Sequence, residues 1–350
     1  MLAYSAVDSV SPAIQRTREF LFRPFAWGTY LKLGLVAIIT EGSAYNFRSS
    51  TGGGQPSGHA PTIPPHLDVS AVQVAAIAAA ILGALLLSMW ILYLLTRLRF
   101  AFFHCVIYNT KEIRPGWHLY REPATRFFWL NVVVGLCFLL LVGVLSLPFI
   151  AGFWRLFHEM RPGSHLDVTL LLSVVLPLIP LILLLVLTVI LIDVILRDWM
   201  LPHFAVDNAR AGEAWRAVRE HIQTEKKQFL VYGLLRLALP AVAMAVLFMV
   251  LLIPGLIVAG SIGVLVYGIH SAFAHSAGGA AEAGLLVQVF FGAVGFLLMA
   301  LAGICLGGPV STGIREYALI FYGGRYQALG DILYPLAPAP PRATGAAGTA

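Results

Sequence analysis

Long uninterrupted apolar runs constrain this chain more than any other feature of its sequence. A helix that crosses a bilayer needs about 20 consecutive, mostly apolar residues. Hydrophobic residues make up 59% of the chain and charged residues only 11%, so a water-soluble fold could not cover its own surface with polar groups. The sequence predicts an all-α fold, a polytopic transmembrane helix bundle. The six predicted spans are 22–41, 72–96, 127–149, 168–196, 229–252 and 285–307.

Basic residues set the predicted orientation of these spans. Segments on one side hold 18 lysines and arginines, and segments on the other side hold three. Cytoplasmic loops carry the excess of positive charge in membrane proteins, so we expect both termini in the cytoplasm. The cytoplasmic group is 1–26, 97–126, 197–228 and 311–350. The opposite group is 42–71, 150–167 and 253–284.

A single membrane domain is predicted over 1–335, and three segments of the chain depart from regular spans. Residues 42–71 are rich in Gly, Ser and Pro, which predicts a flexible outside loop. The Pro/Ala/Gly-rich tail 336–350 is predicted to be disordered. The apolar stretch 255–269 is short and glycine-rich, and a crossing there would place the C-terminal segment outside. We therefore expect this stretch not to cross the bilayer fully.

Amphipathic helices are predicted where the chain enters the membrane from the cytoplasm. Both have the pattern of helices that lie at the level of the lipid headgroups. The first apolar face comprises Val10, Ile14, Thr17, Leu21 and Phe25. The second lies in 213–222 and comprises Trp215, Val218 and Ile222.

An Arg-Glu dipeptide recurs before apolar spans and raises the question of an internal repeat. It occurs as Arg18-Glu19, Arg121-Glu122 and Arg219-Glu220, whereas Arg315-Glu316 follows a span. Three two-span units would produce this pattern. The general concentration of charges in cytoplasmic loops would also produce it, so both explanations stay open.

Ionisable residues inside the spans are the main candidates for a functional site, because a charge in lipid is costly and usually faces protein or water. Lys32, Asp193 and Arg236 lie at similar predicted depth, and Arg197 follows Asp193 by one turn. These four residues predict a charged inner pocket for an anionic headgroup or solute. In the structural alternative, Asp193 pairs with Arg197 while Lys32 and Arg236 extend to lipid phosphates. We expect Asp193 to be held by one of these three cations.

Patterns typical of enzymes and metal sites are missing from the sequence. There is no P-loop, dinucleotide fingerprint or G-x-S-x-G motif. Cys105, Cys137 and Cys305 lack ligand spacing and are expected to act as small hydrophobic residues. The glycines of a GxxxG pattern, Gly303 and Gly307, favour close packing within the chain over dimerisation. We expect a protein that is not an enzyme, with no cofactor, no metal and no nucleic-acid partner.

Three segments resemble a known family. They read SPAIQRTREFLFRPFAWGTYLKLGLVAII at 11–39, RDWMLPHFAVDNARAGEAWRAVREHI at 197–222 and GIREYALIFYGGRY at 313–326. They resemble uncharacterised bacterial multi-pass membrane proteins that are similar to the membrane domain of glycerophosphodiester phosphodiesterases. The resemblance implies a helical bundle in a bacterial plasma (inner) membrane, and it carries over no catalytic residue.

Two functions from different classes fit these features. The first is a non-catalytic protein of the lipid bilayer that binds anionic lipid headgroups or another membrane protein through its basic, aromatic cytoplasmic face. The second is a transporter or channel for a small solute or lipid. A transporter should place several polar groups near the bilayer midplane. The spans hold few, mainly Asn131, Ser173 and Thr188, which favours the first function.

Overall fold

The structure is a computed structural model that describes residues 4–42, 71–159, 168–273 and 279–334. These ranges consist of helices and turns and contain no strand, which confirms the predicted all-α class. Five helices are long and apolar enough to cross a membrane. They are α4 (Ala71–Ile107), α6 (Arg121–Glu159), α7 (Val168–Val194) with its continuation, α10 (Lys226–Phe273) and α11 (Gly279–Gly323).

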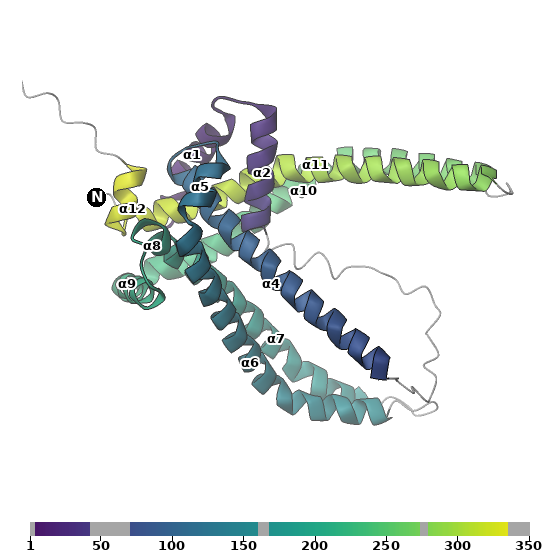
Figure 1. Cartoon of the computed structure of the whole chain (residues 1–350), viewed down its shortest axis with the longest axis horizontal. Helices are drawn as coiled ribbons and strands as arrows, with labels where there is room; N and C mark the ends of the chain where they lie inside the picture. Colours follow the sequence, from purple (N-terminus) through teal and green to yellow (C-terminus); the bar gives the residue numbers. More distant parts are fainter. Residues whose placement is uncertain (1–3, 43–70, 160–167, 274–278, 335–350) are drawn as a thin grey trace, which may run out of the picture.

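The shorter helices gather at one end of the molecule, around the ends of the long helices (Figure 1). They are α1 (Val10–Phe22), α2 (Trp27–Glu41), α5 (Ile113–Leu119), the π-helical turn η1 (Ile195–Met200), α8 (Leu201–Val206), α9 (Ala211–Thr224) and α12 (Gln327–Leu333). We call this end the head. The parts of the long helices that project from it are the arms, defined as residues 72–91, 131–154, 175–192, 237–269 and 285–303.

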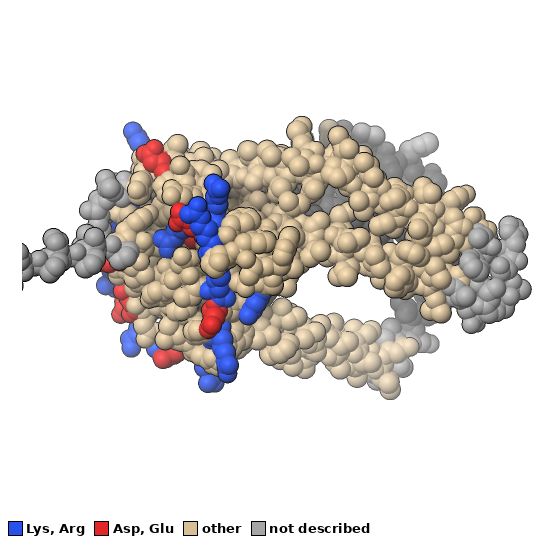
Figure 2. All heavy atoms as spheres, turned by 90° about the horizontal axis from the view of Figure 1, so that it is seen from above, with Lys and Arg blue, Asp and Glu red and all other residues tan. Residues whose placement is uncertain are grey.

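The hydrophobic core lies in the head. Phe127 of α6 packs edge-on against Phe100 of α4 and Phe204 of α8, with ring centroids 5.6 and 5.3 Å apart, and all three are buried. In the arms, the most apolar stretch of every long helix has no buried residue. The arms contain no Asp, Glu, Lys or Arg. Figure 2 shows the charged side chains at the head, with a row of Lys and Arg where head and arms meet.

The first predicted span differs most from its expected form. Its helix, α2, has 15 residues and is about 22 Å long, shorter than the roughly 30 Å hydrocarbon core of a bilayer. It crosses α11 closely because two glycines meet there: a Cβ atom on Gly308 would lie 2.7 Å from the Cα of Gly34. Of the GxxxG pair, Gly307 lies against Ile38 and Gly303 faces open space.

The stretch 255–269 is not a separate element. It continues the fifth predicted span within α10, which has 48 residues and is about 70 Å long. Pro240 and Pro254 lie inside this helix without ending it. The expected break after 252 is therefore absent, and 255–269 belongs to the arm that α10 forms with α11.

The predicted amphipathic helices divide their apolar faces between protein and surface. Helix α1 buries Thr17 and Leu21 but leaves Ile14 exposed, and Phe25 beyond its end is exposed as well. Helix α9 buries Val218 in the head. The head therefore covers much of the surface that the sequence assigned to lipid.

Two parts of the head repeat one another. Asn109 and Asn208 end equivalent helices, and both have a left-handed backbone with a φ of 52°. Asn109 follows Arg99 by ten residues, and Asn208 follows Arg197 by eleven. The extra residue is accommodated by the wider turn of η1. Later landmarks also correspond: Trp117 with Trp215, and Arg121-Glu122 with Arg219-Glu220. These matching landmarks are what an internal duplication would produce.

Candidate functional site

Four elements bring charged side chains together where the arms join the head. We call this group the ion cluster: Glu41 of α2, Arg197 and Asp198 of η1, Arg236 of α10 and Arg315 of α11. Each of these side chains is at most 3% exposed.

Asp198 is the centre of the ion cluster. Its Oδ2 lies 2.8 Å from Nε of Arg236 and accepts a hydrogen bond of 2.8 Å from the Tyr232 hydroxyl. Its Oδ1 lies 3.7 Å from Arg197 Nε and 3.7 Å from Arg315 Nη1. One carboxylate therefore contacts three guanidinium groups that come from three different elements.

Glu41 bridges the same three arginines. Its Oε2 lies 3.5 Å from Arg197 Nε and 3.6 Å from Arg236 Nη2. Its Oε1 lies 3.8 Å from Arg315 Nε. Glu41 is the last residue of α2, and the sequence placed it at the outer end of the first predicted span. The packing of α2 across α11 instead brings its carboxylate to the arginines.

The candidate residues from the sequence are only partly brought together. Asp193 pairs with Arg197, one of its three predicted partners, at 3.1 Å, and its side chain is 27% exposed. Within the described residues it forms no ion pair with Lys32 or Arg236. Arg236 nevertheless belongs to the ion cluster, whereas Lys32 is exposed on α2 and lies outside it.

Sequence reasoning missed Glu41, Asp198 and Arg315, because charges at the ends of spans are common and gave no reason to single them out. The repeat within the head contains a signal that could have pointed to Glu41. Arg99 and Arg197 hold equivalent positions, and Arg99 donates to the carbonyl of Thr40, next to Glu41, at 3.3 Å. Arg99 of α4 and Arg197 of η1, the continuation of α7, therefore both lie at the end of α2.

The ion cluster is suited to holding helices together. Its groups are enclosed and turned toward one another, so a solute has no exposed charged surface to bind. Buried ion pairs add little net stability, but removing one partner leaves an uncompensated charge. The cluster therefore fixes how α2, η1, α10 and α11 are placed relative to one another.

A second buried pair attaches α1 to the same framework. Arg16 lies 3.1 Å from the buried carboxylate of Glu316 on α11. The same guanidinium donates to the carbonyl oxygens of Val106 and Ile107, at 3.2 and 2.9 Å. These carbonyls end α4 and lack helical partners, so Arg16 caps α4 while it holds α1 against α11.

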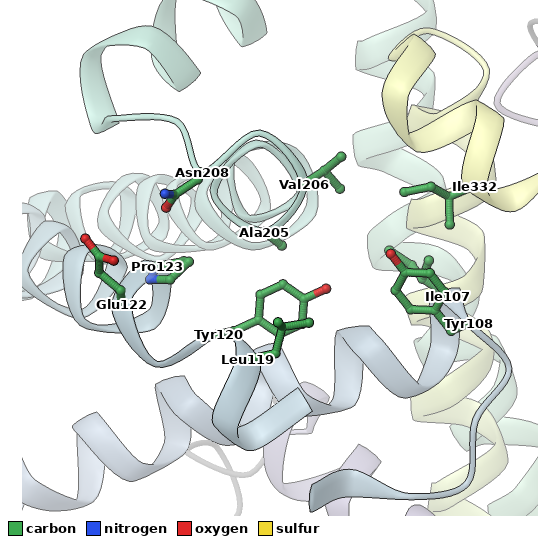
Figure 3. A pocket seen from close by; sticks show the side chains of 10 residues that line it. All are labelled: Ile107, Tyr108, Leu119, Tyr120, Glu122, Pro123, Ala205, Val206, Asn208 and Ile332. Atoms are coloured by element: carbon green, nitrogen blue, oxygen red, sulfur yellow. The ribbon is translucent and has the colours of Figure 1, made fainter. Parts of the chain in front are cut away.

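The head also contains a pocket of about 380 Å³, a volume typical of small-molecule sites. Figure 3 shows Tyr120 between the side that carries Glu122 and the side that carries Tyr108. Burial raises the pKa of Tyr120 to about 12, so its phenol stays protonated. Glu122 pairs with Arg126 and is the only carboxylate among the lining residues. The lining is Ile107, Tyr108, Leu119, Tyr120, Glu122, Pro123, Ala205, Val206, Asn208 and Ile332.

One family model matches the chain over residues 4–332, which include both the head and the arms. The chain belongs to a family of unknown function (DUF7544). The match covers the ion cluster, the pocket and all five long helices. Searches of curated proteins and of solved structures found no match. The membrane domain of glycerophosphodiester phosphodiesterases is not linked to the chain by these comparisons, so that resemblance stays a prediction.

Proposed function

We propose that this integral membrane protein is non-catalytic and binds lipids or partner proteins through its head, at the cytoplasmic surface of a bacterial plasma membrane. The observation that carries the proposal is the separation of charge from apolar surface. The arms lack charged residues, while Lys and Arg side chains lie across the boundary with the head (Figure 2). Basic residues at one end of apolar helices are typical of the cytoplasmic membrane surface.

The position of the ion cluster favours binding over transport. A transport pathway needs polar groups along the depth of the membrane. In the described arms the exposed side chains are overwhelmingly apolar. The ion cluster is enclosed at the junction of arms and head, so it offers a solute no continuous polar route.

Site-specific photocrosslinking in the full-length protein tests this proposal. A photoreactive residue is placed at Ile14 or Leu119 of the head, and the control is placed at Leu183 of the arm, all of them exposed. We expect the head positions to capture lipid headgroups or a defined protein, and Leu183 to capture acyl chains. Crosslinks that come only from the arm, or solute uptake by liposomes that contain the purified protein, would contradict the proposal.

A further inference from the structure

One corner of the head exposes a group of aromatic rings. Phe22 and Phe25 stack with their ring centroids 6.1 Å apart, and Trp27 meets Phe25 edge-on at 5.1 Å. These side chains are 42%, 45% and 64% exposed, respectively. They surround the turn between α1 and α2, and together with the cations described next they form the aromatic corner.

Two cations lie at this turn, and a third follows on α2. Arg23 stands between the two phenylalanines in the sequence, and Lys111 of the turn after α4 donates to the carbonyl of Pro24. Lys32 lies further along α2 and is exposed. None of the three cations forms an ion pair with a described residue.

Few carboxylates are near enough in sequence to neutralise these cations. Glu19 precedes Arg23 by one turn and accepts a hydrogen bond from Gln15, and Glu112 follows Lys111. Arg18 adds a further exposed positive charge on α1. The corner therefore carries net positive charge that forms no ion pair within the described part of the chain.

The aromatic corner adjoins the base of an arm. Tyr30, which contacts all three exposed rings, donates its hydroxyl to the carbonyl of Cys305 on α11. The arm formed by α11 ends at residue 303, directly before this contact. The exposed rings thus lie at the level where the apolar surface of the arm gives way to the head.

We infer that the aromatic corner binds the headgroup region of anionic phospholipids. Aromatic side chains gather at membrane interfaces because their rings are apolar while the interface is wet. Lysine and arginine stems lie along apolar surface and carry their charges to phosphate groups. This inference rests on the proposed function, and it names the surface and the lipid class.

Phosphatidylglycerol retention by the full-length protein tests the inference. The protein is placed in nanodiscs of phosphatidylcholine with a minor fraction of phosphatidylglycerol, and the bound lipids are quantified by mass spectrometry. The test variant is Arg23→Gln/Lys32→Gln/Lys111→Gln. The control, Arg216→Gln/Arg219→Gln/Lys227→Gln, removes three exposed cations elsewhere on the head and changes the net charge equally.

The test variant is expected to lose about ten-fold or more in its preference for phosphatidylglycerol, since each cation near an anionic surface contributes roughly five-fold. The control should keep most of the preference. Equal losses in both variants would assign the effect to net charge and overturn the inference. An unchanged test variant, or no preference in the wild type, would also overturn it.

A separate readout distinguishes this failure from failure of the proposed function. A photocrosslinker at residue 27 should capture phospholipid headgroups, and one at Trp215 on α9 should capture them less. If residue 27 captures no lipid while Ile14 or Leu119 captures a protein, the aromatic corner fails as a lipid site and the proposed function stands.

Discussion

Helices α10 and α11 each pass from an exposed, apolar arm into the buried, charged part of the head within a few turns. In α11, Phe296 is 78% exposed in the arm, whereas Arg315 in the head is 1% exposed. In α10, Arg236 is buried in the head and Met249 is exposed in the arm. The usual rule for soluble proteins is inverted along each helix, with apolar side chains outside and charges inside. The head is packed by protein, and the arms need lipid to cover them.

This contrast separates two kinds of stability. In the head, carboxylates and guanidinium groups from distant segments form ion pairs, so a single substitution can leave a buried charge without a partner. In the arms, no described residue of the most apolar stretches is buried, so their placement depends on the bilayer. Substitutions should therefore act strongly in the head, while the arms should respond to their surroundings.

The largest effect predicted from the contrast between head and arms is the placement of the two ends of the arms on opposite sides of the membrane. Reporter fusions at the C-terminus and at Gly53 are expected to report opposite sides, because α4 begins at the free end of an arm while α12 lies in the head (Figure 1). Activity of both reporters on one side would contradict this topology and would mean that the five long helices do not all cross.

The same fusions decide the number of crossings. Both described ends of the chain lie in the head, and an odd number of crossings cannot leave both ends on one side. If Gly53 is outside, the chain must cross once more before α4, and α2, about 22 Å long, is shorter than a full span.

The next largest effect is expected in the ion cluster. Asp198→Asn should lower the free energy of unfolding by about 3–5 kcal/mol, because Arg197, Arg236 and Arg315 lose their shared counter-charge. Asp193→Asn is the matched control, since its carboxylate is partly exposed and forms its ion pair with Arg197, and it should cost no more than about 1 kcal/mol. Thermal unfolding in detergent measures both variants. A loss at Asp193 that equals the loss at Asp198 would contradict the geometry described here.

The sequence predicted the arms better than the head for a physical reason. Lipid selects for average apolarity over about 20 residues, which a single stretch of sequence reveals. The head depends on contacts between distant segments: Glu41 meets Arg197, and Arg16 reaches Glu316. The pair between Asp193 and Arg197 was predictable because it is local, four residues apart on one helix.

The ends of the helices were also hard to predict, because they too depend on contacts between distant segments. The predicted span 72–96 ends where charged residues begin, but α4 continues to Ile107, because its final turns pack into the core of the head. Likewise α2 was predicted from its apolar composition, whereas its observed position depends on the contact between Gly34 and Gly308. Composition gives no information about which glycine meets which.

The crossing of α2 and α11 gives the third prediction. Gly308→Ala should lower the free energy of unfolding by about 1–3 kcal/mol, because the new Cβ would meet backbone 2.7 Å away and the two helices would have to separate. Gly303→Ala lies in the same helix with nothing within 4 Å, so it should be neutral or slightly stabilising. Thermal unfolding of the two variants, side by side, measures the difference. Similar effects would mean that the helices do not cross at these glycines.

The smallest effect concerns the two repeated turns. Asn109 and Asn208 have a left-handed backbone that asparagine and glycine adopt more readily than alanine. Asn109→Ala and Asn208→Ala should each lower the free energy of unfolding by about 1 kcal/mol, whereas the glycine variants should stay within a few tenths of the wild type. The weak, exposed contact of 3.4 Å between Arg126 and the Asn208 side chain adds little. Gln223→Ala, exposed on α9 with a right-handed backbone, should have almost no effect. If only one asparagine showed the difference between alanine and glycine, the two turns would not be equivalent, and the case for duplication would rest on the sequence pattern alone.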